Sequence, residues 1–113
     1  MKKILAVDDD ADILLTLKEE LEFCGHKVDV LQNPLDVENS IKSDDYDIIL
    51  LDIVMPELNG LELLEKIHPY KKKSKFVLLS GMGTVMTADP RSDLADLIID
   101  KPYTLADIKR ILD

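Results

Sequence analysis

Apolar runs alternate with amphipathic stretches along the chain, and this alternation predicts a sheet covered by helices. Residues 3–7, 48–51, 76–79 and 97–99 form runs that are almost entirely apolar. Continuous runs of this kind are typical of parallel strands that are covered on both faces. Residues 26–31 alternate between apolar and polar positions, which predicts a strand nearer the edge of the same sheet.

The first predicted helix follows the first apolar run. Its inner face consists of five residues at helical spacing: Ile13, Leu14, Leu17, Leu21 and Cys24. Asp10 is expected to cap the start of this helix, and Gly25 is expected to end it. Cys24 is expected to be a small core residue rather than a reactive thiol.

Three further helices are predicted at well-marked positions. The second helix has Asn33 as its N-cap and Pro34 as its first residue. Its inward-facing residues are expected to be Leu35, Val37 and Ile41. A third helix is expected over residues 60–68, and Thr104 is expected to cap the last helix.

Five strands joined by helices in one chain predict an α/β fold. Because crossovers between parallel strands are right-handed, helices should cover both faces of a doubly wound, five-stranded parallel sheet. The fourth helix is expected to be irregular, because Pro90 interrupts the weak periodicity of residues 82–95. The length of 113 residues suits a single domain over residues 1–113.

The composition excludes several classes of protein. A net charge of −9 opposes direct binding to nucleic acid or to an anionic membrane. A single cysteine cannot form an internal disulfide, and it suits a reducing cytoplasm. No apolar stretch reaches membrane-spanning length, and the run at residues 4–7 is too short for a signal peptide. We therefore expect a soluble cytoplasmic protein.

Charged and hydroxyl residues follow the predicted strands directly. Asp8 and Asp9 follow the first strand, Asp52 follows the central strand, and Ser80 and Lys101 follow the last two. The carboxyl ends of parallel strands meet at one edge of a sheet, and ligands bind at that edge. We therefore expect these five side chains to converge on one small site.

Three converging carboxylates predict a bound cation. Two carboxylates about 4 Å apart repel by roughly 4 kcal/mol at an effective dielectric of about 20. An acidic site with only oxygen ligands suits Mg²⁺. Ser80 and Lys101 then offer a hydrogen bond and a positive charge to a phosphoryl group. Asp52 can act as the nucleophile that accepts it.

This arrangement resembles the receiver (CheY-like) domain of two-component response regulators. The matching residues run through nearly the whole chain: Asp8, Asp9, Asp52, Pro56, Gly60, Ser80, Gly81, Lys101 and Pro102. The resemblance implies that Asp52 accepts a phosphoryl group, in a Mg²⁺-dependent reaction, from a phosphohistidine. The donor would be a sensor histidine kinase or a phosphotransfer protein. Phosphorylation would then switch the binding of partners.

The resemblance also implies a role for each residue of the site. Asp9 and Asp52 would bind Mg²⁺ directly, together with the backbone carbonyl of Val54, and Asp8 would bind it mainly through water. Ser80 would contact the phosphoryl oxygens. Lys101 would pair with Asp52 or its phosphate, and the bond from Lys101 to the following proline would be cis.

The same resemblance implies partners and a limited form of catalysis. A downstream protein, or an effector domain of the same protein, would respond to phosphorylation, and a phosphorylation-linked homodimer stays open. A receiver of this kind is not an enzyme, because it catalyses only its own phosphorylation and dephosphorylation. The chain is expected to be either a complete single-domain regulator or the receiver of a longer protein.

Three features depart from the family pattern. Ile98 stands where most receivers carry Tyr or Phe, so the aromatic part of the switch is missing. Val54 and Met82 are apolar where some relatives hold polar groups that orient a hydrolytic water, which predicts a long-lived phosphate. The irregular fourth helix predicts an atypical output surface.

Two other functions stay open on the sequence. A degenerate receiver would bind partners without being phosphorylated. The intact set of acids, hydroxyl and lysine argues against this alternative, whereas Ile98 and the irregular fourth helix leave it open. A small Mg²⁺-dependent phosphatase of the haloacid-dehalogenase type also uses an aspartate at a strand end. That family has a second acid two residues later, where this chain has Val54, so turnover of a substrate is disfavoured.

Overall fold

The computed structural model describes residues 1–52, 60–70, 73–80, 93–100 and 104–112, and it confirms the predicted sheet. Five parallel strands lie in the order β2-β1-β3-β4-β5. Their bounds are Lys3–Val7 (β1), Lys27–Leu31 (β2), Ile48–Asp52 (β3), Lys75–Ser80 (β4) and Leu97–Asp100 (β5). β2 is an edge strand, as its alternating pattern predicts, whereas β3 is central and buried along its whole length.

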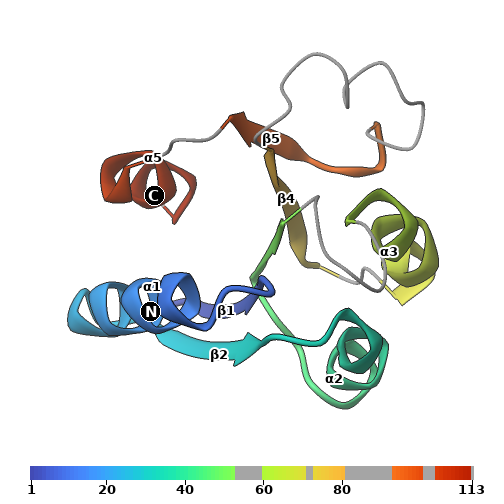
Figure 1. Cartoon of the computed structure of the whole chain (residues 1–113), viewed down its shortest axis with the longest axis horizontal. Coiled ribbons are helices and arrows are strands. Elements are labelled where there is room, and N and C mark those ends of the chain that lie inside the picture. Colours follow the sequence, from blue (N-terminus) through green and yellow to red (C-terminus); the bar gives the residue numbers. More distant parts are fainter. Residues whose placement is uncertain (53–59, 71–72, 81–92, 101–103, 113) are drawn as a thin grey trace.

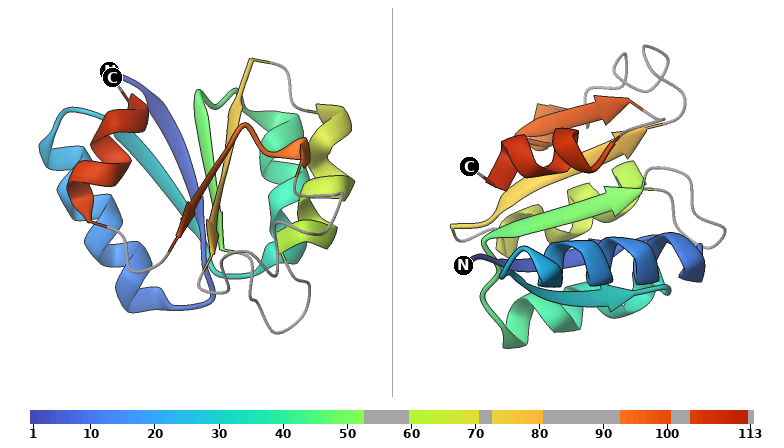
Figure 2. Two further views of the ribbon diagram at one scale, coloured as in Figure 1. Left: turned by 90° about the horizontal axis from the view of Figure 1, so that it is seen from above. Right: turned by 90° about the vertical axis from the view of Figure 1, so that its left-hand side faces the viewer.

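Helices cover both faces of this sheet (Figures 1 and 2). α1 and α5 lie on one face, and α2 and α3 lie on the other. Their bounds are Ala11–Phe23 (α1), Val37–Ser43 (α2), Gly60–Ile67 (α3) and Leu105–Leu112 (α5). Two short 3-10 helices, η1 (Pro34–Asp36) and η2 (His68–Tyr70), precede α2 and follow α3. The predicted fourth helix falls largely outside the described residues.

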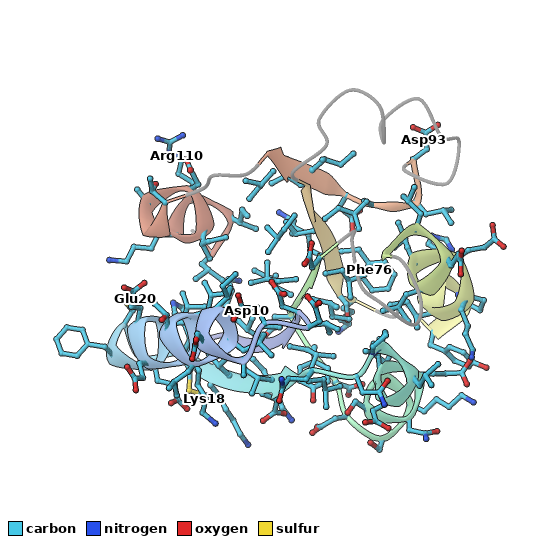
Figure 3. The ribbon with its side chains drawn as sticks, viewed as in Figure 1. Asp10, Lys18, Glu20, Phe76, Asp93 and Arg110 are labelled. Carbon is cyan, nitrogen blue, oxygen red and sulfur yellow. The ribbon has the colours of Figure 1, made fainter. Side chains whose placement is uncertain are left out.

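Alternate residues of each buried strand serve the two faces of the sheet. In β3, Ile49 and Leu51 belong to the core shared with α2 and α3, whereas Ile48 and Leu50 belong to the core under α1 and α5. Phe76 of β4 is fully buried on the side of α3 (Figure 3). Burial on both faces explains why the strands are unbroken apolar runs in the sequence.

The caps predicted at Asp10 and Thr104 are confirmed, and the Asp10 side chain caps α1. Asn33 caps the 3-10 helix η1 rather than α2, which begins only at Val37. Thr104 Oγ1 accepts the backbone N–H of Asp107 at 3.3 Å, which caps α5. Gly25 has a φ of +94°, a conformation that glycine adopts without steric cost, and it ends α1 as expected.

Two predicted core positions are exposed instead. Cys24 is the C-cap of α1 and lies past the turns that pack on the sheet, so its side chain is exposed. Leu35 lies in η1 rather than in an α-helix, and it is 53% exposed. A 3-10 helix has about 3.0 residues per turn, so Leu35 is rotated away from the face on which Val37 and Ile41 are buried.

Hydrogen bonds close the edge of the sheet where the strands begin. The Tyr46 hydroxyl donates to Asp29 Oδ2 at 2.8 Å, and Ser74 Oγ donates to the backbone oxygen of Tyr46 at 2.7 Å. Burial, together with the Asp29 carboxylate, raises the pKa of the Tyr46 phenol.

None of the helices in the described segments combines the length and the apolar composition needed to cross a membrane.

Candidate functional site

Three carboxylates meet at the edge where the strands end. Asp8 follows β1, and Asp52 is the last residue of the neighbouring strand β3, in a register that pairs Val7 with Leu51. Asp8, Asp9 and Asp52 each offer a carboxylate oxygen, and these oxygens all lie within 4.8 Å of one another. The predicted convergence of these three acids is therefore confirmed.

Asp8 is held by the strand on one side and by the following turn on the other. Its backbone N–H donates to the carbonyl of Leu31, at the end of β2, at 3.2 Å. Its Oδ1 atom accepts the backbone N–H of Asp10 at 3.0 Å, which forms an Asx-turn over residues 8–10. This turn fixes the orientation of a carboxylate that is only 2% exposed.

Asp10 continues the chain from this turn into α1. Its Oδ1 atom accepts the backbone N–H groups of Asp12 at 2.9 Å and of Ile13 at 3.3 Å. Its carbonyl accepts the N–H of Leu14 at 3.2 Å, which is the first hydrogen bond of the helix. The side chains of Asp8 and Asp10 thus connect the end of β1 to the start of α1, and Asp9 lies between them.

Asp9 is exposed, and a neighbouring loop contacts its backbone. The side-chain amide of Gln32, which follows β2, donates to the Asp9 carbonyl at 3.5 Å. Sequence reasoning missed Gln32, because no local pattern marks it. The contact arises only because β2 pairs with β1 and ends beside it.

The negative charges of the clustered acids favour the binding of a cation. Asp52 is 5% exposed and lies in the most buried strand, between β1 and β4. Two unit charges 4.8 Å apart repel by about 3.5 kcal/mol at an effective dielectric of about 20. The donor set consists of carboxylate oxygens, with one exposed member that leaves access for water. This chemistry fits Mg²⁺, which prefers oxygen ligands and keeps several waters.

The remaining predicted site residues are described only in part. Ser80 is the last residue of β4, where it pairs with Asp100 of β5, so its backbone lies at the same edge as Asp52. Lys101 and Val54 lie outside the described residues. The roles assigned to Ser80, Lys101 and Val54 therefore stay predictions.

Hydrogen bonds between Thr104 and Asp107 fix the start of α5. Asp107 Oδ2 accepts the backbone N–H of Thr104 at 2.9 Å and the Thr104 hydroxyl at 3.2 Å. This backbone hydrogen bond, followed by the one from the hydroxyl, holds the pKa of the Asp107 carboxyl below its ordinary value.

Ile98 of β5 is partly buried against the core under α2 and α3, where the side chain lacks the hydroxyl of a tyrosine.

Comparisons with known proteins agree with this geometry. The family model of the response regulator receiver domain matches residues 4–113. The response regulator receiver protein CpdR of Brucella abortus is 30% identical over 110 residues, which cover 96% of this chain and 91% of CpdR. The chain spans much less of other curated relatives, such as 31% of the transcriptional regulatory protein SpaR of Bacillus subtilis.

Solved receiver structures share the fold over the whole chain. The response regulator TrrA of Thermotoga maritima, solved in complex with Mg²⁺-BeF, matches with a TM-score of 0.88 and 35% identity over 99% of this chain and 96% of TrrA. A CheY-like receiver domain of Methanospirillum hungatei matches with a TM-score of 0.90 and 31% identity over 99% of this chain and 90% of that one. The fold, the acidic edge and the family match together show that this chain belongs to the response regulator receiver domain family of two-component systems.

Proposed function

We propose that this chain is a phospho-accepting receiver and that Asp52 is its phosphorylation site. The observation that carries the proposal is the convergence of Asp8, Asp9 and Asp52 at the carboxyl edge of the sheet. Asp52 is the member at the end of the central strand, and it is buried. The TrrA complex with Mg²⁺-BeF supports the same assignment by similarity.

The transfer reaction requires one bond to form and one to break. An oxygen of the Asp52 carboxylate attacks the phosphorus of a phosphohistidine, the new O–P bond forms, and the P–N bond breaks. The imidazole leaves with the bonding electron pair and takes up a proton. Ser80 and Lys101 are the residues we assign to the phosphoryl oxygens, and they would stabilise the transferred charge.

The acidic residues would hold Mg²⁺ during this reaction. Asp9 and Asp52 would be direct ligands with the Val54 carbonyl, and Asp8 would act mainly through water. When bound, Mg²⁺ supplies positive charge to the oxygens of the transferred group. The Asx-turn would orient the Asp8 carboxylate before the ion binds.

The partners follow from the same assignment. A histidine kinase or a phosphotransfer protein is the proposed donor, and the complex of the histidine kinase ThkA with TrrA supports this by similarity. A downstream protein, an effector domain of the same protein or a second copy would respond to phosphorylation. We place the protein in the cytoplasm, and we assign it no turnover of an external substrate.

Acetyl phosphate with Mg²⁺ tests the proposal directly. We expect a mass increase of one phosphoryl group, which peptide mapping places on Asp52, and Asp52→Ala should abolish it. The Glu20→Gln variant is the matched control, because Glu20 lies far along α1 from Asp10 (Figure 3) and its loss should change nothing. Continuous release of phosphate would instead indicate a phosphohydrolase. No modification of the Mg²⁺-loaded protein would indicate a phosphorylation-independent binding module.

A further inference from the structure

We infer that Asp10 is a positioning residue that sets the affinity of the acidic site for Mg²⁺ through its hydrogen bonds to α1. The inference rests on the proposed function, because Mg²⁺ is the ion that the site would hold. Asp10 is exposed, and it is not one of the three acids whose oxygens converge. Its effect would therefore pass through the backbone of its neighbours.

The backbone of Asp10 orients one carboxylate of the site directly. Its N–H donates to Asp8 Oδ1 at 3.0 Å, so the position of this N–H decides where the Asp8 carboxylate lies. Asp10 has φ −91° and ψ 107°, the extended conformation of an N-cap residue, although the helix begins at the next residue. Because β1 and α1 are both fixed by their packing, a change of these angles would have to be compensated by the backbone of residues 8 and 9, and this would move the Asp10 N–H relative to Asp8.

The side chain of Asp10 is what holds that conformation. Its Oδ1 atom accepts the N–H groups of Asp12 and Ile13, which ties the residue to the first turn of α1. Ile13 is partly buried against the core under α1 and α5, so this turn is itself anchored to the fold. Asp10 therefore links the packed helix to the buried carboxylate of Asp8, through its side chain on one side and its backbone N–H on the other.

Asp9 depends on the same anchor. It is exposed, and its backbone is bounded by the turn that Asp8 closes and the cap that Asp10 makes. Without the cap, the first turn of α1 can fray, and residues 9 and 10 gain conformations in which the ligands do not converge. Apparent affinity falls in proportion to the fraction of molecules that have the competent conformation.

Substitutions at Asp10 separate this positioning role from a role of its charge. Asp10→Ala removes the cap and the charge, whereas Asp10→Asn and Asp10→Ser remove only the charge and keep an oxygen that can cap the helix. We expect Asp10→Ala to weaken Mg²⁺ binding measurably, by up to about fivefold, the factor that corresponds to about 1 kcal/mol of lost capping. Asn and Ser should stay within about twofold of the wild type, because they rank with Asp or just below it as N-caps.

The matched control loses a hydrogen bond at the opposite edge. Tyr46→Phe removes the hydroxyl that donates to Asp29, and it should lower the melting temperature by an amount comparable to Asp10→Ala. Its Mg²⁺ affinity should equal that of the wild type, because Tyr46 precedes β3 whereas Asp52 ends it. A general loss of stability is thereby distinguished from a local loss of ligand order.

The experiment is a Mg²⁺ titration of the ¹⁵N-labelled full chain, followed by NMR for all five proteins. A loss of more than twofold in Asp10→Ala with rescue by Asn and Ser supports the inference. Equal losses of Mg²⁺ affinity in the Ala, Asn and Ser variants would show that only the charge of Asp10 matters. An unchanged affinity in the Ala variant would show that the helix cap does not affect Mg²⁺ binding. Either result overturns the inference. Phosphorylation of the same samples at saturating Mg²⁺ tests the proposed function separately, because a wild type that binds Mg²⁺ but accepts no phosphoryl group defeats only that proposal.

Discussion

Removal of the charge on Asp52 should stabilise the protein when Mg²⁺ is absent. Asp52→Asn keeps the size and shape of the side chain and removes one of three negative charges at the carboxyl edge of the sheet. The oxygens of these acids lie within 4.8 Å of one another, and Asp8 and Asp52 are both buried. Without a cation, their repulsion opposes folding.

The distance gives the size of the expected effect. At 4.8 Å a pair of unit charges repels by about 3.5 kcal/mol at an effective dielectric of about 20, and by about 1 kcal/mol in water. The larger figure applies to the buried pair with Asp8, and the smaller one to the pair with the exposed Asp9, so the relief is up to about 4 kcal/mol. The amide loses the attraction of groups that contact the carboxylate, so we expect about half of this, or a rise in melting temperature of about 8 °C.

Differential scanning calorimetry with a chelator and then with Mg²⁺ measures both parts of the prediction. Mg²⁺ at ten times its Kd should stabilise the wild type by about 1.4 kcal/mol and the variant by less than half of that. Glu20→Gln controls for the general benefit of a lower net charge, because Glu20 is an exposed acid of α1 outside the cluster. If Asp52→Asn melts at the same temperature as Glu20→Gln and gains as much from Mg²⁺ as the wild type, the carboxylates do not repel one another in solution.

Three further predictions concern other parts of the chain. Thr104 holds the pKa of Asp107 below its ordinary value of 3.8. The stability that Asp107 contributes should therefore be complete at neutral pH, and it should be lost as the pH falls below 3.8 and through the pKa of the folded protein. An NMR titration that places the Asp107 midpoint at or above 3.8 would contradict this. Gly25→Ala should cost about 1 kcal/mol in urea unfolding through backbone strain alone, because φ is +94° and an added Cβ would meet nothing within 4 Å; an unchanged midpoint would show that the turn relaxes. The phosphate on Asp52 should be long-lived, and Val54→Asn should shorten its lifetime, since a polar side chain can orient the attacking water. Decay of the wild-type radiolabel within seconds would refute this prediction.

Much of the candidate site could be predicted because its residues stand directly after buried strands. A run such as residues 48–51 is typical of a strand that is covered on both faces, and the parallel arrangement then places Asp52 beside Asp8. The caps at Asp10 and Thr104 are also local, since each side chain bonds to backbone within three residues. These features depend on neighbours in the chain, which the sequence displays directly.

Other features depend on neighbours in space. Cys24 and Leu35 are apolar residues at helical spacing, yet both are exposed. Cys24 lies at the end of α1, and Leu35 lies in a tighter 3-10 turn, and the orientation of both segments depends on what packs against them. Gln32 contacts Asp9 only because β2 lies beside β1. The amino-acid sequence by itself determined the order of the elements, the edge at which the acids gather and their chemistry. Only the tertiary structure decided which acids are buried, how far apart their oxygens lie and which side chains hold them, because those quantities are set by packing between segments that are distant in the chain.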